Sequence, residues 1–276
     1  MQCRAVTPDR RRLIETGSAG RRAAALAALV CLAAAAAVLL WQQRAQDARS
    51  CLPFQGKGAE VWLVLGQSNA GNHGERRHEA GPRVAAFDGS RCAPARDPLP
   101  GGDGDGGSLW TPLAERWVRE GRAARVLVAM VSEEATAVAR WQPGEPLHRR
   151  ALGAAAALER RGLRVTRILW VQGEADAIVG TPAGTYAEAL AAALQPLHEG
   201  TGAPAWIAQT GRCGDAYSAA VRDAQVLVAA AYPWAHSGPD LDRIGPDGRF
   251  ERCHFSAAGQ ARAVALWHEA LVRSGD

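Results

Sequence analysis

Short apolar runs alternate along the chain with alanine-rich stretches whose apolar positions recur every three or four residues. The first pattern predicts buried strands and the second predicts helices that pack on one face. Strands are expected at 61–65, 125–131, 165–171, 205–209 and 234–236, and helices at 108–121, 147–161, 185–199, 219–231 and 256–273. This alternation predicts an α/β fold, with a parallel sheet of about five strands covered by helices on both faces.

The N-terminal pattern is different. Residues 23–41 form a run of 19 residues without a charged side chain, close to the ~20 that cross a bilayer as a helix. Five arginines between positions 10 and 22 precede it, which favours a cytoplasmic N-terminus. We therefore expect a cytoplasmic basic tail at 1–22, a membrane anchor at 23–41, a linker at 42–57 and a folded domain at 58–274. The alternative is a signal peptide that is cleaved near Ala45–Ala48.

The charge distribution follows the same division. The 276 residues carry a formal net charge of +4, but residues 1–50 hold 8 arginines against 3 acids. Residues 51–276 hold 24 basic and 25 acidic side chains, a net charge of −1. The folded domain therefore has no excess of positive charge, which argues against a nucleic-acid partner.

The cysteines fit an exported domain on the extracytoplasmic, periplasmic side of a membrane. Four of the six lie beyond the apolar run, at Cys51, Cys92, Cys213 and Cys253. No C-x-x-C pair occurs, so a zinc or thioredoxin-like site has little support. Four cysteines allow three pairings, and we expect Cys51–Cys92 and Cys213–Cys253 in an oxidising compartment. Four free, buried thiols are the alternative.

Polar residues follow three of the predicted strands. Gly-Gln-Ser-Asn occupies 66–69, Ser-Glu-Glu-Ala-Thr occupies 132–136, and Gln-Gly-Glu-Ala-Asp occupies 172–176. The carboxyl ends of parallel strands meet at one edge of a sheet, where α/β folds place their chemistry. A serine at that edge needs a base and an orienting acid to become a nucleophile. Near the C-terminus, Glu251 and His254 are three residues apart, so in a helical turn they share a face.

In combination, these motifs resemble the SGNH hydrolases, and within them the sialate O-acetylesterase-like carbohydrate esterases. The resemblance rests on GQSN after the first strand, WVQGEAD after the third, and the carboxylate-x-x-His near the C-terminus, and it covers most of residues 58–272. It implies a three-layer α/β/α fold of flavodoxin-like type. It also implies a serine esterase mechanism without a metal or another cofactor.

Carried onto this sequence, the resemblance makes Ser68 the nucleophile and His254 the general base. Glu251 stands where the family usually has aspartate, and it is the preferred acid because glutamate is only one methylene longer. The alternatives are a Ser-His dyad, or one of three nearby acids: Asp240, Asp242 and Asp247.

The resemblance also suggests an oxyanion hole. Its expected donors are the N–H of Ser68, the N–H of Ala135, with Gly107 as a fallback, and the side-chain amide of Gln172. The family usually has Gly-Gly-Thr after the second strand, and here Glu134 and Ala135 replace the two glycines. A carboxylate pointing inward from Glu134 would oppose the developing oxyanion.

Three further residues are assigned to substrate binding. Asn69 follows the nucleophile, and Trp110 and Trp141 are candidates for stacking on a sugar ring. Core packing is the slightly favoured alternative for both tryptophans.

Four other polar residues near the predicted strand ends or the site are treated separately. Glu174 and Asp176 are interpreted as scaffold carboxylates that accept loop N–H groups. His73 and His236 could reach the site, although neither has an obvious carboxylate at a suitable spacing.

The function expected from these residues is a membrane-anchored or exported serine esterase that removes O-acetyl groups from a carbohydrate. An O-acyltransferase on the same scaffold is one alternative, and a non-catalytic glycan-binding envelope protein is another. A lipase or phosphodiesterase is less favoured, because the chain has no G-x-S-x-G motif and no cluster of metal ligands in its sequence.

Overall fold

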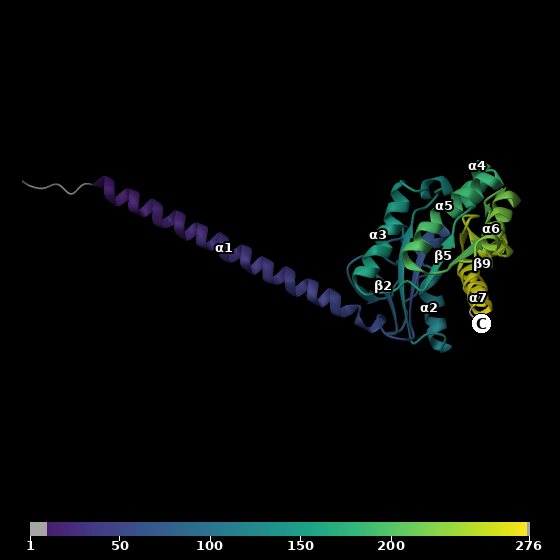
Figure 1. Ribbon diagram of the computed structural model, residues 1–276, viewed down its shortest axis with the longest axis horizontal. Helices are drawn as coiled ribbons and strands as arrows, with labels where there is room; N and C mark the ends of the chain where they lie inside the picture. The colour runs from purple at the N-terminus through teal and green to yellow at the C-terminus, as the bar shows by residue number, and fades with distance from the viewer. Residues whose placement is uncertain (1–9, 275–276) are drawn as a thin grey trace, which may run out of the picture. The chain divides into compact units, whose positions relative to one another are not determined.

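The computed structural model describes residues 10–274 of the chain and separates it into two units (Figure 1). The first unit ends at Asp47, and the second begins at Ala48 and contains every strand.

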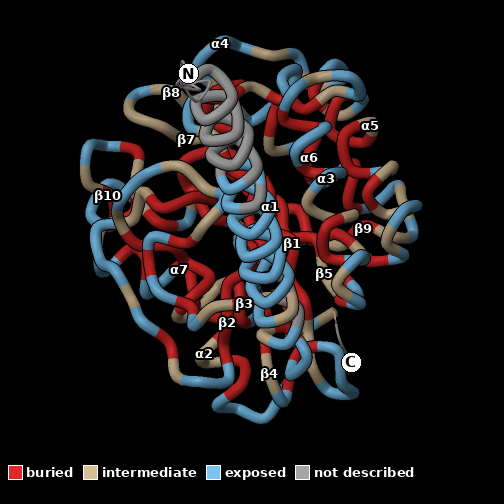
Figure 2. Tube along the Cα trace, turned by 90° about the vertical axis from the view of Figure 1, so that its left-hand side faces the viewer, coloured by how far each residue is buried: buried red, intermediate tan, exposed pale blue. Residues whose placement is uncertain are grey.

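The first unit is built from helix α1, Arg10–Ser50. Its large apolar side chains between Leu26 and Trp41 are exposed and coloured accordingly in Figure 2. The stretch Ala28–Phe54 is long and apolar enough to cross a membrane by length and composition, and it overlaps the expected span at 23–41. A signal sequence near the N-terminus would meet the same criteria of length and composition.

The expected linker at 42–57 is not a separate segment. Residues 42–50 continue α1, and Cys51 and Phe54 are buried in the core of the second unit. Cys51 is disulfide-bonded to Cys92, which ties this short polar stretch to the folded body.

The second unit contains a seven-stranded sheet in the order β3-β2-β4-β1-β5-β6-β9. Central β1 pairs in parallel with β4 on one side and β5 on the other. Within this seven-stranded sheet, β2 and β3 are the one antiparallel pair. The strands are β1 (Ala59–Gly66), β2 (Val84–Phe87), β3 (Cys92–Pro94), β4 (Arg125–Ser132), β5 (Arg167–Val171), β6 (Ala205–Gln209) and β9 (Ala235–Asp240).

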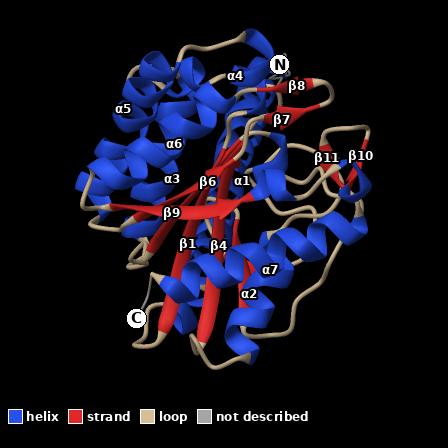
Figure 3. Ribbon diagram, turned by 90° about the vertical axis from the view of Figure 1, so that its right-hand side faces the viewer, coloured by secondary structure: helices blue, strands red, loops and turns tan. Residues whose placement is uncertain are grey.

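Helices cover both faces of this sheet (Figure 3). α3, α5 and α6 pack on one face, and α2 and α7 pack on the other. Residues of β1 alternate between the two cores: Leu63 and Leu65 face the first, and Trp62 and Val64 face the second. Because both faces are buried, the strand reads as one continuous apolar run. The helices are α2 (Trp110–Arg119), α3 (Pro146–Arg160), α4 (Glu174–Val179), α5 (Ala183–Thr201), α6 (Ala219–Ala231) and α7 (Ala257–Arg273).

The predicted three-layer α/β/α fold is therefore confirmed, but the sheet has seven strands where the sequence suggested about five. The two strands that were missed, β2 and β3, span four and three residues at one edge. Runs this short carry too little periodicity to be distinguished from loops. The short helix α4 and two hairpins, β7 (Arg212–Cys213) with β8 (Ala216–Tyr217) and β10 (Arg249–Phe250) with β11 (His254–Phe255), were missed for the same reason.

Both expected disulfides are present. Cys51 pairs with Cys92, and Cys213 pairs with Cys253. The second disulfide joins the β7–β8 hairpin to the residue before His254. It therefore lies at the sheet edge where the polar residues gather.

Candidate active site

Ser68 lies two residues after the point where β1 and β5 approach each other closely. Gly66, the last residue of β1, has a φ of 144°, and a Cβ there would lie 1.9 Å from the carbonyl oxygen of Val171. Only glycine fits this position without moving β5. The next residue, Gln67, donates its backbone N–H to the same oxygen. Ser68 then begins a single helical turn, Ser68–Ala70, at the carboxyl end of the central strand.

A pocket of about 310 Å³ brings Ser68 and His254 together. Its walls come from the ends of β1, β4 and β5 and from the two disulfide-bonded segments. They are formed by Gln67, Ser68, Glu134, Ala135, Ala175, Ile178, Val179, Cys213, Cys253 and His254. A larger cavity of about 490 Å³ lies between α3 and α5, and its lining residues include no serine, cysteine or histidine.

His254 lies beside Glu251, but the two are joined by the turn between β10 and β11 and not by the helical turn that the spacing suggested. Its Nδ1 lies 3.4 Å from Glu251 Oε2. The Glu251 side chain is 70% exposed, whereas that of His254 is 18% exposed. Glu251 and Arg252 both adopt positive φ, 50° and 63°, which forms the tight turn between β10 and β11. Such an exposed, long contact orients the imidazole weakly.

The other three acids considered are occupied elsewhere. Asp240 and Asp242 both accept hydrogen bonds from Arg222, and Asp247 accepts one from Arg262. Within residues 10–274, Glu251 is the acid that contacts the His254 ring.

The pKa of His254 is lowered from its usual value, chiefly because burial disfavours the charged ring. Glu251 acts in the opposite direction through its hydrogen bond, and the neighbouring His73 lowers the pKa further. The ring is therefore neutral at neutral pH, which is the form that accepts a proton.

Two backbone N–H groups border the pocket beside Ser68. Ala135 has a φ of 54°, a region that glycine occupies readily and other residues rarely do, so the backbone here has a conformation suited to glycine. Among the described residues, no hydrogen bond uses the N–H of Ser68 or of Ala135. The loop before Ala135 is fixed because Glu133 donates its N–H to Gly66 and Glu134 donates its N–H to the Asp103 carboxylate.

Two expected oxyanion donors require correction. The Gly107 N–H donates to the carbonyl of Gly74, so it is not available as a fallback. The side-chain amide of Gln172 is fully buried and donates to the Thr136 carbonyl at 2.9 Å and to Asp176 Oδ2 at 2.6 Å. An amide that is committed on both N–H groups cannot also bind an oxyanion.

The substrate-binding assignments of both tryptophans are also corrected. Trp110 is fully buried against Trp267 and donates its indole N–H to the Ala70 carbonyl. Trp141 is buried against Trp170. Neither presents a ring face on which a sugar could stack.

Asn69 has a structural role that its position alone did not indicate. Its side-chain amide is buried and donates to Glu174 Oε1 at 2.8 Å and to the Cys253 carbonyl at 3.4 Å. It thus links the turn that carries Ser68 to the strand that carries His254, and its amide is not directed at the substrate.

The carboxylates after β5 are scaffold groups, as interpreted from the sequence. Asp176 accepts hydrogen bonds from Gln172, Val138 and Thr181. Glu174 is completely buried, and burial raises its pKa, although Asn69 and Arg249 oppose the shift. Its Oε2 has no hydrogen-bond partner among the described residues.

Of the two further histidines, one lies at the site. The His73 ring lies 4.9 Å from the His254 ring between centroids. His236 instead packs against Trp206. Sequence reasoning missed Asp103 and Glu134 as partners of His73, because neither has a local spacing that signals the contact. It also missed Ile178 and Val179, which are exposed on α4 and form the apolar wall of the pocket.

Comparison with known proteins also indicates an esterase. A family model described as "Carbohydrate esterase, sialic acid-specific acetylesterase" matches residues 58–263. No curated protein matches the chain.

Solved structures share the fold at low identity. A protein from Arabidopsis thaliana has a TM-score of 0.66 at 16% identity, covering 78% of this chain and 98% of its own. A carbohydrate acetylesterase from Xanthomonas citri has a TM-score of 0.56 at 17% identity, covering 79% of this chain and 57% of its own. NanS has a TM-score of 0.54 at 16% identity, covering 78% and 97%.

Proposed function

The chain belongs to the sialic acid-specific acetylesterase family of carbohydrate esterases and is a carboxylic-ester hydrolase, and we propose that it removes O-acetyl groups from a carbohydrate through Ser68, His254 and Glu251. The observation that carries the proposal is that Ser68 and His254, from opposite ends of the domain sequence, line one pocket at the carboxyl edge of the sheet. A neutral imidazole there is able to take the serine proton.

In the first half-reaction, Ser68 Oγ attacks the acetyl carbonyl carbon while His254 takes its proton. The oxygen that gains negative charge is stabilised by the N–H groups of Ser68 and Ala135, which no other described group uses. When the bond to the sugar oxygen breaks, His254 returns the proton to that oxygen and the alcohol leaves. Glu251 stabilises the imidazolium while it exists.

In the second half-reaction, His254 takes a proton from water, and the resulting hydroxide attacks the acetyl-enzyme carbonyl. Collapse of the intermediate breaks the bond to Ser68 Oγ, which receives the proton from His254. Acetate is released and the serine is restored.

The test compares the full-length chain, purified in detergent, with three variants on p-nitrophenyl acetate and on acetylated monosaccharides. We expect Ser68→Ala and His254→Ala to lower kcat/KM by about a thousandfold or more. Ser237→Ala is the control, since Ser237 is exposed on β9 away from the pocket lining. Equal rates for wild type and Ser68→Ala would rule out the serine mechanism.

We also propose that α1 anchors the protein in a membrane with the catalytic domain on the extracytoplasmic side. The proposal is supported by the exposed apolar helix and by two disulfides, which persist in oxidising compartments. Protease treatment of intact cells or spheroplasts should reach a C-terminal tag but not an N-terminal one. Intact mass measurement distinguishes this anchor from a signal peptide removed near residues 45–48. A reduced protein in the soluble cytoplasmic fraction would contradict both.

A further inference from the structure

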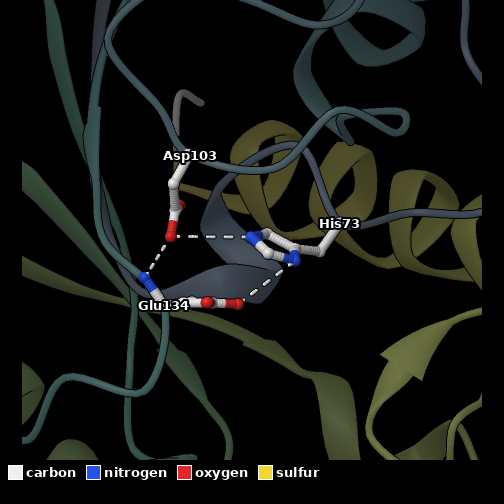
Figure 4. Close-up of side chains that lie close together, drawn as sticks. All are labelled: His73, Asp103 and Glu134. Atoms are coloured by element: carbon white, nitrogen blue, oxygen red, sulfur yellow. Dashed lines mark hydrogen bonds and ion pairs between the residues drawn. The ribbon is translucent and has the colours of Figure 1, made fainter.

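His73 lies between the carboxylates of Asp103 and Glu134 (Figure 4), and its ring packs beside that of His254. Its Nε2 lies 3.5 Å from Asp103 Oδ2, and its Nδ1 lies 3.8 Å from Glu134 Oε2. The side chain is only 14% exposed. Gly104 allows the loop to cover the ring, because a Cβ there would lie 2.7 Å from His73 Cδ2.

This arrangement favours the imidazolium form of His73. A neutral imidazole donates from one nitrogen only, whereas the charged ring presents an N–H toward each carboxylate. The pKa of His73 is raised, first by the Asp103 carboxylate close to its Nε2 and then by the charges of Glu134 and Asp105, against the opposing effect of burial.

Contacts between Asp103 and Glu134 also fix the loop that carries the Ala135 N–H. The Asp103 carboxylate accepts hydrogen bonds from the Glu134 N–H and from Ser132 Oγ, the latter at 3.1 Å. Glu134 is 63% exposed, and its carboxylate lies beside Nδ1 of the His73 ring. The positive charge on His73 therefore offsets the carboxylate that occupies the position of a family glycine.

His73 also packs against His254, with the two rings tilted by 33°. The charged groups that face His254 are Glu251, Glu134 and His73. The two carboxylates favour a proton on His254, and an imidazolium 4.9 Å away opposes it. At this separation like charges interact strongly in a partly buried site.

The two carboxylates of this cluster flank different nitrogens of His73. A metal ion binds one imidazole nitrogen only, and the Asp103 carboxylate already accepts two hydrogen bonds. The geometry is therefore that of two ion pairs that share His73, one with Asp103 and one with Glu134.

We propose that His73 is a positioning residue of the active site, an imidazolium held between Asp103 and Glu134 that fixes the oxyanion loop and opposes a proton on His254. The proposal rests on the proposed function for its catalytic consequence. A positive charge on His73 also explains how this chain tolerates the negative charge of Glu134 beside the pocket.

The experiment measures kcat/KM on p-nitrophenyl acetate between pH 4.5 and 8 for wild type, His73→Gln, His73→Arg and His78→Gln. In His73→Gln the acid limb should move to higher pH by roughly half to one unit, because the cation that opposes His254 protonation is gone. His73→Arg keeps the charge and should restore the wild-type limb. His78→Gln is the matched control, since His78 pairs with Glu115 on α2.

NMR titration of the histidine rings in the wild-type chain gives an independent answer. We expect His73 to titrate above the ordinary histidine range and His254 below it. The proposal is overturned if His254 titrates at or above that range, if the acid limb is the same in His73→Gln and wild type, or if a chelator reproduces the His73→Gln shift.

The outcomes separate this inference from the proposed function. Wild-type hydrolysis that is lost in Ser68→Ala supports the esterase whatever His73 does. If the wild type does not hydrolyse esters, the ring titrations still decide whether His73 is the charged partner of His254, and they need no variant to fold.

Discussion

The side-chain amide of Gln172 donates a 2.6 Å hydrogen bond to Asp176, four residues further along the chain. The same amide donates to the Thr136 carbonyl, and the Gln172 side-chain oxygen accepts from the Tyr186 hydroxyl. Gln172 therefore joins the ends of β4 and β5 beneath the pocket and does not line it.

We predict that Gln172→Ala acts mainly on stability. The substitution leaves the buried Asp176 carboxylate and the Thr136 carbonyl each short of a hydrogen-bond donor, at about 1–3 kcal/mol for each unsatisfied group. Urea denaturation should show a large fall in the free energy of unfolding. Unchanged stability together with a kcat loss of about 10²–10³ would instead identify Gln172 as an oxyanion donor.

Ala135 supplies a second prediction through its positive φ of 54°. Because an L-residue there carries strain of about 1 kcal/mol that glycine lacks, Ala135→Gly should raise the free energy of unfolding by roughly 0.5–1 kcal/mol and keep activity.

The matched control is Ala137→Gly, two residues away, where φ is −68°. Glycine relieves no strain at that position and should lower stability by a similar amount. Equal effects of the two substitutions, measured by denaturant unfolding, would show that the left-handed conformation carries no strain.

The two disulfides form an internally matched pair, because their sequence separations are 41 and 40. The chain-entropy model assigns about 4 kcal/mol to each. Replacing either pair by serine should therefore lower the melting temperature similarly.

Only the Cys213→Ser, Cys253→Ser variant should also lose kcat, since both residues line the pocket and Cys253 precedes His254. Assays well below both melting temperatures separate the two effects. Equal kcat losses in both double variants would contradict a local role for the second disulfide.

Glu174 gives a prediction about pH and stability. Its pKa in the folded state is raised above 4.5 by burial, so the folded protein holds this proton more tightly than the unfolded chain. The stabilisation is complete below the unfolded pKa and is lost as pH rises through the folded one.

Glu174→Gln removes this titration and keeps an oxygen for Asn69. The variant should therefore gain stability relative to wild type as pH rises from 4 toward 7, measured by melting temperature. Glu199→Gln, at an exposed position on α5, is the control. A difference between wild type and Glu174→Gln that stays constant with pH would mean that folding does not shift the pKa of Glu174.

Glu251 provides the last prediction. Its contact with His254 is 3.4 Å long and its side chain is 70% exposed, and exposed ion pairs contribute at most about 1 kcal/mol. Glu251→Gln should therefore lower kcat by about fivefold or less, far less than His254→Ala. A loss of about 10⁴ in kcat would mean instead that Glu251 orients the imidazole as strongly as a buried triad acid.

The sequence by itself determined the fold class, the order of the principal strands and helices and the gathering of polar residues at one sheet edge. Apolar periodicity reports which face of an element is buried, and a parallel sheet aligns its carboxyl ends, so these features follow from local pattern. Ser68 lies at that edge for this reason, whereas His254 reaches the same pocket from the β10–β11 hairpin.

Only the tertiary structure decided what each polar or aromatic side chain near that edge contacts. Gln172 and Asn69 donate to buried partners, Trp110 and Trp141 fill the two cores, and His73 lies against His254 between Asp103 and Glu134. Most of these partners lie far away in sequence, and neither spacing nor polarity encodes the direction of a side chain. A hydrogen bond or an ion pair exists only once packing has brought its two atoms within reach.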